Sequence, residues 1–160
     1  MSNFQKEQKK ISFDQALPLI EEKLKSGGSV KFSPHGISMR PLIRQGKDSV
    51  TVSKLKNSPR INDVIFYRRP DGQYVLHRIV GRDVEGFVLR GDNQRILERG
   101  IKEQWIIGVM TSVKRKNREF SCDSKGYGVY LKVVLPLWRL WLVPKGYLSR
   151  IKNKLKKRNS

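Results

Sequence analysis

The chain has 160 residues, which is enough for one domain or for one domain with short appendages. It contains 34 Lys and Arg against 14 Asp and Glu, a formal net charge of +20, and 38% of its residues are hydrophobic. With 9% aromatic residues it can still build a core, so the composition excludes a disordered polymer, a collagen-like chain and a multi-span membrane protein. A single cysteine, Cys122, excludes a disulfide scaffold and a cysteine-based zinc site, and we expect no metal.

The positive charge is concentrated near the end of the chain. Residues 1–31 have a net charge of +2, residues 32–112 of +6 and residues 113–160 of +12. This charge attracts an anionic partner, which the composition leaves open as nucleic acid, lipid or an acidic peptide. Because the middle segment is only mildly basic, chemistry there need not share the purpose of the basic end.

We expect no membrane-spanning segment. The polar residues 1–10 lack the apolar core of a signal peptide. The most apolar stretch, residues 129–143, is shorter than the ~18 residues of a spanning helix, and Lys132 and Arg139 interrupt it. The sequence therefore predicts a cytoplasmic protein.

Residues 1–28 predict one N-terminal helix. Apolar residues recur at helical spacing between residues 13 and 24, and Gly27-Gly28 follows them as a stop signal. Pro18 favours a start near Asp14. One helix is too little for a helix-turn-helix DNA-binding protein.

Residues 29–125 predict a mainly β domain, and residues 126–160 an aromatic and basic tail. Short apolar or alternating runs are separated by turn residues, and Pro70-Asp71-Gly72 predicts a hairpin. Seven short strands with few helices indicate a small antiparallel barrel or sandwich. The expected strands cover residues 29–33, 49–53, 64–67, 73–80, 86–89, 105–113 and 119–122.

Two side chains suggest nucleophilic chemistry. Ser38 lies between Gly36 and Pro41, where a turn can present its hydroxyl and aim backbone N–H groups at an oxyanion. His77 shares the apolar face of its strand with Ile79, a position that suits either a core histidine or a general base.

Carboxylates follow in the chain. Asp92 belongs to the turn Gly91-Asp92-Asn93-Gln94, and Glu98 comes soon after it. Serine, histidine and carboxylate are the parts of a nucleophilic hydrolase, although any chain contains many such triples.

The order and spacing of four short motifs resemble the signal-peptidase and LexA-repressor superfamily of serine proteases. The resemblance covers about residues 30–118 and is closest to the endoplasmic-reticulum-type signal peptidases, which have histidine where most bacterial members have a lysine base. Residues 91–100 are also similar to the Gly-Asp-Asn-Asn…Asp-Arg-Gly motif of that branch. The four motifs are Ser38-Met39-Arg40-Pro41, His77-Arg78-Ile79, Gly91-Asp92-Asn93 and Ile107-Gly108-Val109.

This resemblance implies a coiled antiparallel barrel and a serine endopeptidase that cleaves a peptide or precursor protein without a cofactor. Ser38 would be the nucleophile and His77 the general base, and either Asp92 or Glu98 would orient the imidazole. The backbone N–H of Ser38 would form part of the oxyanion hole. The neighbouring residues implied in substrate or oxyanion binding are Gly36, Ile37, Met39 and Pro41.

Two other functions stay open. A self-cleaving LexA-like regulator would need a DNA-binding domain and an Ala-Gly or Cys-Gly bond, and the chain contains neither dipeptide. A non-catalytic module of the same fold would use its basic surface to bind lipid or nucleic acid.

The tail has two interpretations. Residues 129–158 combine tryptophans with a basic face, which suits a helix on an anionic membrane surface and would make the protein peripheral to the inner membrane. Alternatively, Trp138 and Trp141 pack back on the barrel. Nucleic acid is a less favoured partner because the aromatic residues cluster in an apolar run.

Overall fold

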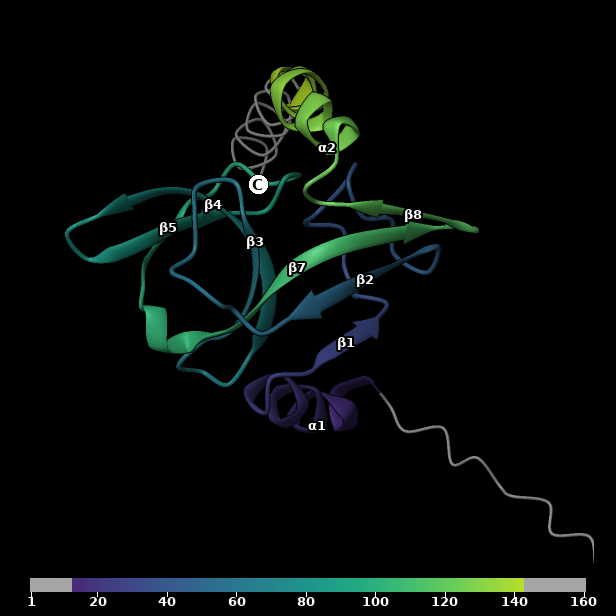
Figure 1. Ribbon diagram of the computed structural model, residues 1–160. Helices are drawn as coiled ribbons and strands as arrows, with labels where there is room; N and C mark the ends of the chain where they lie inside the picture. Colours follow the sequence, from purple (N-terminus) through teal and green to yellow (C-terminus); the bar gives the residue numbers. More distant parts are fainter. Residues whose placement is uncertain (1–12, 143–160) are drawn as a thin grey trace, which may run out of the picture.

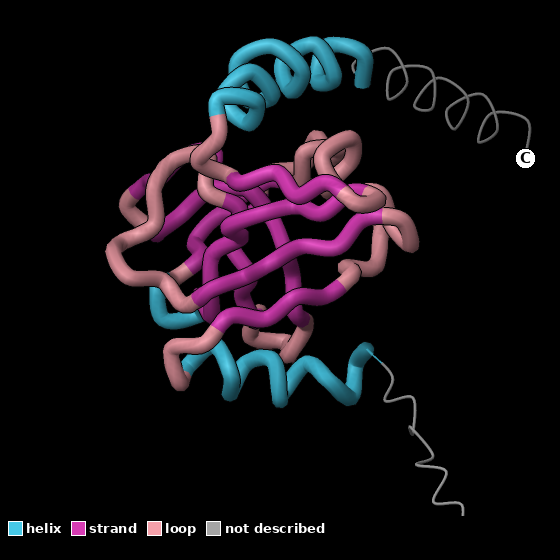
Figure 2. The backbone as a smooth tube through the Cα atoms, turned by 45° about the vertical axis from the view of Figure 1, so that its right-hand side comes forward, coloured by secondary structure: helices cyan, strands magenta, loops and turns pink. Residues whose placement is uncertain are grey.

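The computed structural model describes residues 13–142, and their side chains from residue 16 onward. A mainly β fold is confirmed: a curved antiparallel sheet lies between a helix at one end and a C-terminal helical segment at the other (Figure 1, Figure 2). The regular elements are α1 (Phe13–Lys25), β1 (Ser29–Phe32), β2 (Asp48–Ser53), β3 (Val64–Arg68), β4 (Tyr74–Asp83), β5 (Gly86–Arg90), β6 (Glu98–Ile101), a 3-10 turn (Glu103–Trp105), β7 (Ile106–Arg115), β8 (Arg118–Ser121), α2 (Lys125–Val129) and a π-helical turn (Tyr130–Val134) that continues as helix through residues 135–142.

Eight strands form one open sheet, seven of them in the order β1-β2-β7-β3-β4-β5-β6 and the eighth, β8, paired with β7 outside this order. The long strand β7 organises it, because β2 pairs along one edge while β3 and β8 share the other. β3 pairs with residues 106–109 of β7, and β8 with residues 112–115. Pro70-Asp71-Gly72 joins β3 to β4 as a hairpin turn, as its sequence predicts.

Helix α1 covers one face of the sheet. Its residues Leu17, Ile20 and Leu24 are buried, as the helical spacing predicts. The helix ends in a Schellman motif in which the Gly28 N–H donates to the Lys23 carbonyl and Gly27 adopts a φ of 92°. The helix begins at Phe13 and contains Pro18, whose side chain is exposed.

Apolar side chains are buried on both faces of the central strands. In β3, Val64 and Phe66 join the cluster under α1, whereas Ile65 and Tyr67 join a second cluster on the opposite face. This arrangement explains why β3 is continuously apolar rather than alternating. The second cluster is completed by Ile79, Phe87, Leu89 and Ile101.

One strand of the sheet is absent from the seven that the sequence predicts. Residues 98–101 form β6, which pairs with β5 and makes one edge of the sheet, so the sheet has eight strands rather than seven. The segment Glu-Arg-Gly-Ile lacks alternation and contains a glycine, and for this reason it carries no strand signal. The most basic part of the expected tail, residues 145–160, lies outside the described residues.

A buried carboxylate ties the loop between β1 and β2 to the sheet. Asp48 is 2% exposed and accepts hydrogen bonds from the side chains of Arg44 and Arg115. Arg115 also donates to the carbonyl oxygens of Pro41 and Leu42, at 3.2 and 3.0 Å. Burial alone would raise the pKa of Asp48, but the two arginines outweigh it and lower that pKa to about 2.

This ion cluster predicts a specific loss of stability in acid. A carboxylate with a lowered pKa stabilises the fold above its unfolded pKa of ~3.9, and the stabilisation is lost as the pH falls toward 2. The free energy of unfolding of the wild-type protein should therefore decrease by ~2 kcal/mol more than that of Asp48→Asn between pH 4 and pH 2. Urea titrations at each pH measure this difference. Asp123→Asn, at an exposed carboxylate, is the control, and its unfolding free energy should decrease as that of the wild type does. An equal decrease between pH 4 and pH 2 in the wild type and in Asp48→Asn would contradict the prediction.

Candidate active site

Ser38 lies on a tight turn in the loop between β1 and β2. The turn begins at Gly36, whose φ of 93° lies in the left-handed region, and Arg40 donates its N–H to the Ile37 carbonyl at 3.2 Å. Met39 is 5% exposed and packs in the core under α1, so the residue next to Ser38 anchors the loop. Ser38 itself is half-buried.

This loop docks on the turn that follows β5. The backbone N–H of Asn93 donates to the Ser38 carbonyl at 2.7 Å, and the Asn93 side-chain amide donates to the Ile37 carbonyl at 3.2 Å. A Cβ on Gly91 would lie 2.7 Å from the Ser38 carbonyl oxygen, so only glycine permits this approach. The Gly-Asp-Asn turn therefore positions the backbone of the candidate nucleophile.

His77 points into the second core cluster, with the apolar face of β4 as the alternation predicts. It is 5% exposed, and its Nδ1 lies 3.7 Å from Oε2 of Glu98, which is an electrostatic contact rather than a hydrogen bond. Burial lowers the pKa of His77, and the nearby Glu98 opposes this shift only in part. The imidazole is therefore neutral at pH 7 and able to accept a proton.

Glu98 is held in place by two partners at the start of β6. The Arg69 guanidinium donates two hydrogen bonds of 2.7 Å to its carboxylate, and the Tyr67 hydroxyl donates a third of 2.7 Å. Burial alone would raise the pKa of Glu98, but these donors outweigh it and the pKa lies below its ordinary value. Glu98 is thus a fixed anion beside His77.

Asp92 binds an arginine instead of the histidine. Its carboxylate accepts hydrogen bonds from Arg78 Nε and Nη2 at 2.7 and 2.6 Å, and both side chains are fully buried. Arg78 also donates to the Asn62 carbonyl and to the Tyr127 hydroxyl, while the Tyr130 hydroxyl donates to Asp92. Of the two carboxylates that the sequence left as alternatives, the structure places Glu98 beside His77 and Asp92 in this buried ion pair.

The C-terminal helical segment packs on the same turn. Trp138 Nε1 donates to the Asn93 side-chain oxygen at 3.2 Å, and Arg139 lies 3.8 Å from Asp92. Leu135 is buried, Trp138 is half-buried and Trp141 is exposed. In the part of the tail that the structure describes, Trp138 thus packs back on the β domain.

The contacts between the Ser38 loop and the strand of His77 are indirect. Asn93 holds the Ser38 backbone, and the adjacent Asp92 holds Arg78, which follows His77 in β4. Among residues 16–142, no hydrogen bond joins the Ser38 hydroxyl to the His77 ring. The Ser38 cleft is lined by residues of the cluster under α1, whereas His77 points into the second cluster, so in the described chain the two side chains are linked only through these backbone and neighbouring contacts.

The other residues implied by the resemblance have different surroundings. Gly36 and Ile37 are exposed, whereas Met39 belongs to the core. Pro41 follows a cis peptide bond, and its carbonyl accepts from Arg115. Within the described residues, no group of three or more His, Cys, Asp or Glu side chains is placed to hold a metal ion.

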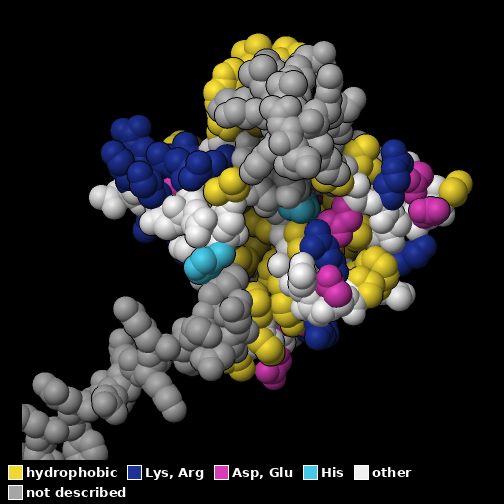
Figure 3. All heavy atoms as spheres, turned by 180° about the vertical axis from the view of Figure 1, so that it is seen from behind, with side chains coloured by type: hydrophobic (Ala, Val, Ile, Leu, Met, Phe, Trp, Pro, Cys, Tyr) yellow, Lys and Arg dark blue, Asp and Glu magenta, His cyan; other side chains and the backbone are white. Residues whose placement is uncertain are grey.

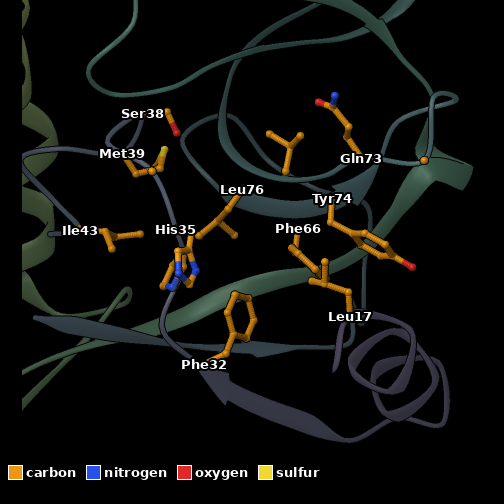
Figure 4. Close-up of a pocket in the computed structure, with 14 residues that line it drawn as sticks. Leu17, Phe32, His35, Ser38, Met39, Ile43, Phe66, Gln73, Tyr74 and Leu76 are labelled. Carbon is orange, nitrogen blue, oxygen red and sulfur yellow. The ribbon is translucent and has the colours of Figure 1, made fainter. Parts of the chain in front are cut away.

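An open cleft of about 560 Å³ runs past Ser38. Figure 4 shows Ser38 at one end and Tyr74 and Leu17 at the other, with apolar side chains between them. The first half of β4 pairs with β3, whereas its pairing with β5 begins at Arg78, so in the described chain its other edge has no strand partner along the cleft. The cleft is lined by Leu17, Phe32, Pro34, His35, Gly36, Ser38, Met39, Ile43, Phe66, Gly72, Gln73, Tyr74, Val75 and Leu76.

The groups that hold the site together leave little trace in the sequence. Alternation in β4 places Arg78 on the face opposite His77, where the structure buries it completely, and no sequence pattern indicates this burial. The sequence gives no signal for the roles of Arg69, Tyr127 and Tyr130. The one signal for Arg78 was a charged residue following a histidine within an otherwise apolar strand.

Comparison of the chain with protein-family models, with curated proteins and with solved structures gave no match. Between residues 13 and 142, none of the helices has the length and apolar character needed to cross a bilayer.

The buried ion pair should be tightly coupled in stability. Removing either partner, in Arg78→Met or Asp92→Asn, leaves an uncompensated buried group and should cost ~3–5 kcal/mol of unfolding free energy. The double variant Arg78→Met/Asp92→Asn should lose much less than the sum of the two losses, because neither charge is then left alone. Equilibrium denaturation of the four proteins measures the coupling, and additive losses would contradict it.

Proposed function

We propose that this protein is a serine endopeptidase of the signal-peptidase-like type, which cleaves an extended segment of a peptide or precursor protein. The observation that carries the proposal is the shared turn 91–94, which binds the backbone of the Ser38 loop and the side chain of Arg78, the residue that follows the buried His77 in β4. Its support from the sequence is the order of the motifs around Ser38, His77 and Asp92.

In the first step, Ser38 Oγ attacks the scissile carbonyl carbon as His77 removes the hydroxyl proton. Because Nδ1 of His77 faces Glu98, Nε2 is the nitrogen that takes this proton. Glu98 stabilises the imidazolium that forms, with Arg69 and Tyr67 holding the carboxylate in position. The backbone N–H of Ser38 donates to the oxyanion.

Collapse of the tetrahedral intermediate breaks the peptide bond. His77 returns its proton to the leaving amine, and an acyl ester on Ser38 remains. Water then attacks this ester with His77 as the base, which releases the new carboxylate and restores the hydroxyl.

The cleft suits an extended peptide. A substrate strand can pair with the open edge of residues 74–77 of β4, while alternate side chains enter the apolar cleft beside Met39 and Leu76. This geometry favours a segment with small or apolar side chains near the cleaved bond.

Removal of the nucleophile tests the proposal. The wild-type protein and Ser38→Ala are incubated with a peptide library that contains apolar residues at every position, and the products are identified by mass spectrometry. Ser38→Ala should lose cleavage by at least ~10³-fold, because the covalent step then has no nucleophile. Ser33→Ala, an exposed serine in the same loop, is the matched control and should retain activity. Equal cleavage by Ser38→Ala, or no cleavage by the wild type, would favour a non-catalytic module.

The pH profile tests His77 as the base. Because burial lowers its pKa, the acidic limb of kcat/KM should have its midpoint below pH 6.5. Glu98→Gln removes the anion that raises this pKa, so the midpoint should move to lower pH while kcat decreases. Initial rates between pH 4 and pH 8 measure both effects. A midpoint that stays fixed in Glu98→Gln would exclude Glu98 from this role.

A further inference from the structure

The outer side of the C-terminal helical segment is apolar and exposed. Leu137, Leu140 and Trp141 have the i, i+3, i+4 spacing of one helix face, and Val129 and Val133 have the i, i+4 spacing one turn earlier. Figure 3 shows hydrophobic side chains gathered along the top of this segment. This outer apolar face comprises Val129 (57% exposed), Val133 (49%), Val134 (43%), Leu137 (60%), Leu140 (66%) and Trp141 (51%).

Packing on the inner side keeps this face turned outward. Tyr130 donates to Asp92, Trp138 donates to Asn93, and Leu135 is 2% exposed. These contacts occupy the opposite side of the segment, so the helix cannot bury its apolar face by rotating without breaking them. An exposed apolar stripe of this length marks an interaction surface in a soluble domain.

The neighbouring loops extend the surface. Ile37 is 54% exposed and lies in the loop that Asn93 binds, while Ile96 is 82% exposed in the segment after that turn. Trp138 contacts the same Asn93. Apolar side chains therefore surround the turn that positions Ser38.

The exposed charged side chains at this end of the molecule are mainly basic. The three segments that meet here, residues 34–47, 90–97 and 124–142, contain one acidic side chain between them, and this residue, Asp92, is fully buried. Lys132 and Arg95 are exposed in the same segments. Asp123, directly before the last segment, is exposed, but the exposed charged side chains within the three segments are all basic. An apolar face with mainly basic neighbours complements a surface that is both apolar and negatively charged.

We propose that the outer apolar face docks on an anionic lipid bilayer and thereby places the mouth of the Ser38 cleft at the membrane surface. A second copy of the chain fits this surface less well, because each copy carries a net charge of +20. Nucleic acid satisfies the charge but not the exposed leucines. The proposal concerns binding and does not rest on the peptidase function.

Binding of the full chain to vesicles tests the proposal. Co-sedimentation with vesicles of phosphatidylglycerol and phosphatidylcholine should exceed that with phosphatidylcholine alone. The double variant Leu137→Ser/Leu140→Ser should reduce the partition coefficient on the anionic vesicles by at least ~10-fold, because two apolar side chains are no longer buried in the interface. Val84→Ser, a fully exposed apolar residue in the turn between β4 and β5, is the matched control and should bind as the wild type does.

The depth of the helix provides a second measurement. Brominated acyl chains should quench tryptophan fluorescence of the wild type and of Trp105→Phe, whereas Trp141→Phe should lose most of the quenching. Anionic binding that is unchanged in Leu137→Ser/Leu140→Ser would overturn the proposal in favour of charge alone. Concentration-dependent dimerisation that the same double variant abolishes, without vesicle binding by the wild type, would overturn it in favour of a second copy.

Discussion

The buried ion pair between Arg78 and Asp92 is the interaction on which the arrangement of this protein depends. Both charges are withdrawn from water, a costly step that is offset only where each polar atom finds a partner. The pair meets this condition because Asn62, Tyr127 and Tyr130 supply the remaining hydrogen bonds. One ion pair consequently connects β4, the turn after β5 and the C-terminal helical segment.

The two carboxylates Asp92 and Glu98 have different partners. Asp92 forms a fully buried ion pair with Arg78, whereas Glu98, six residues later on β6, lies beside His77. Arg69 and Tyr67 keep Glu98 ionised despite its partial burial, and burial keeps His77 neutral. Environment rather than residue type therefore assigns the role that the peptidase proposal gives to each acid.

Three features converge on one end of the molecule: the cleft beside Ser38, the buried ion pair and the outer apolar face. Asn93 links them, since its backbone holds the Ser38 loop and its side chain accepts from Trp138. The helix that bears Leu137 and Leu140 is thus connected to the backbone of Ser38 through Trp138 and Asn93.

Local patterns in the sequence determined most of the fold. The helical spacing of Leu17 and Leu24 predicts α1, Pro70-Asp71-Gly72 predicts the hairpin, and alternation in β4 predicts that His77 faces the core. These features depend on neighbours within a few residues, which a single sequence contains. The sequence does not predict β6, because residues 98–101 pair with β5 without showing the alternating pattern of a strand.

The tertiary structure alone decided which groups meet. From the sequence, Asp92 and Glu98 were equal candidates for the carboxylate beside His77. Only the path of β6 brings Glu98 to the ring of His77, while Asp92 pairs with Arg78. The sequence also contained two interpretations of the tail, and only the contacts of Tyr130 and Trp138 show which side of residues 125–142 is buried. Such pairings join residues that lie about 14 to 45 positions apart, and they arise from the closure of loops and the packing of the sheet, which no local pattern encodes.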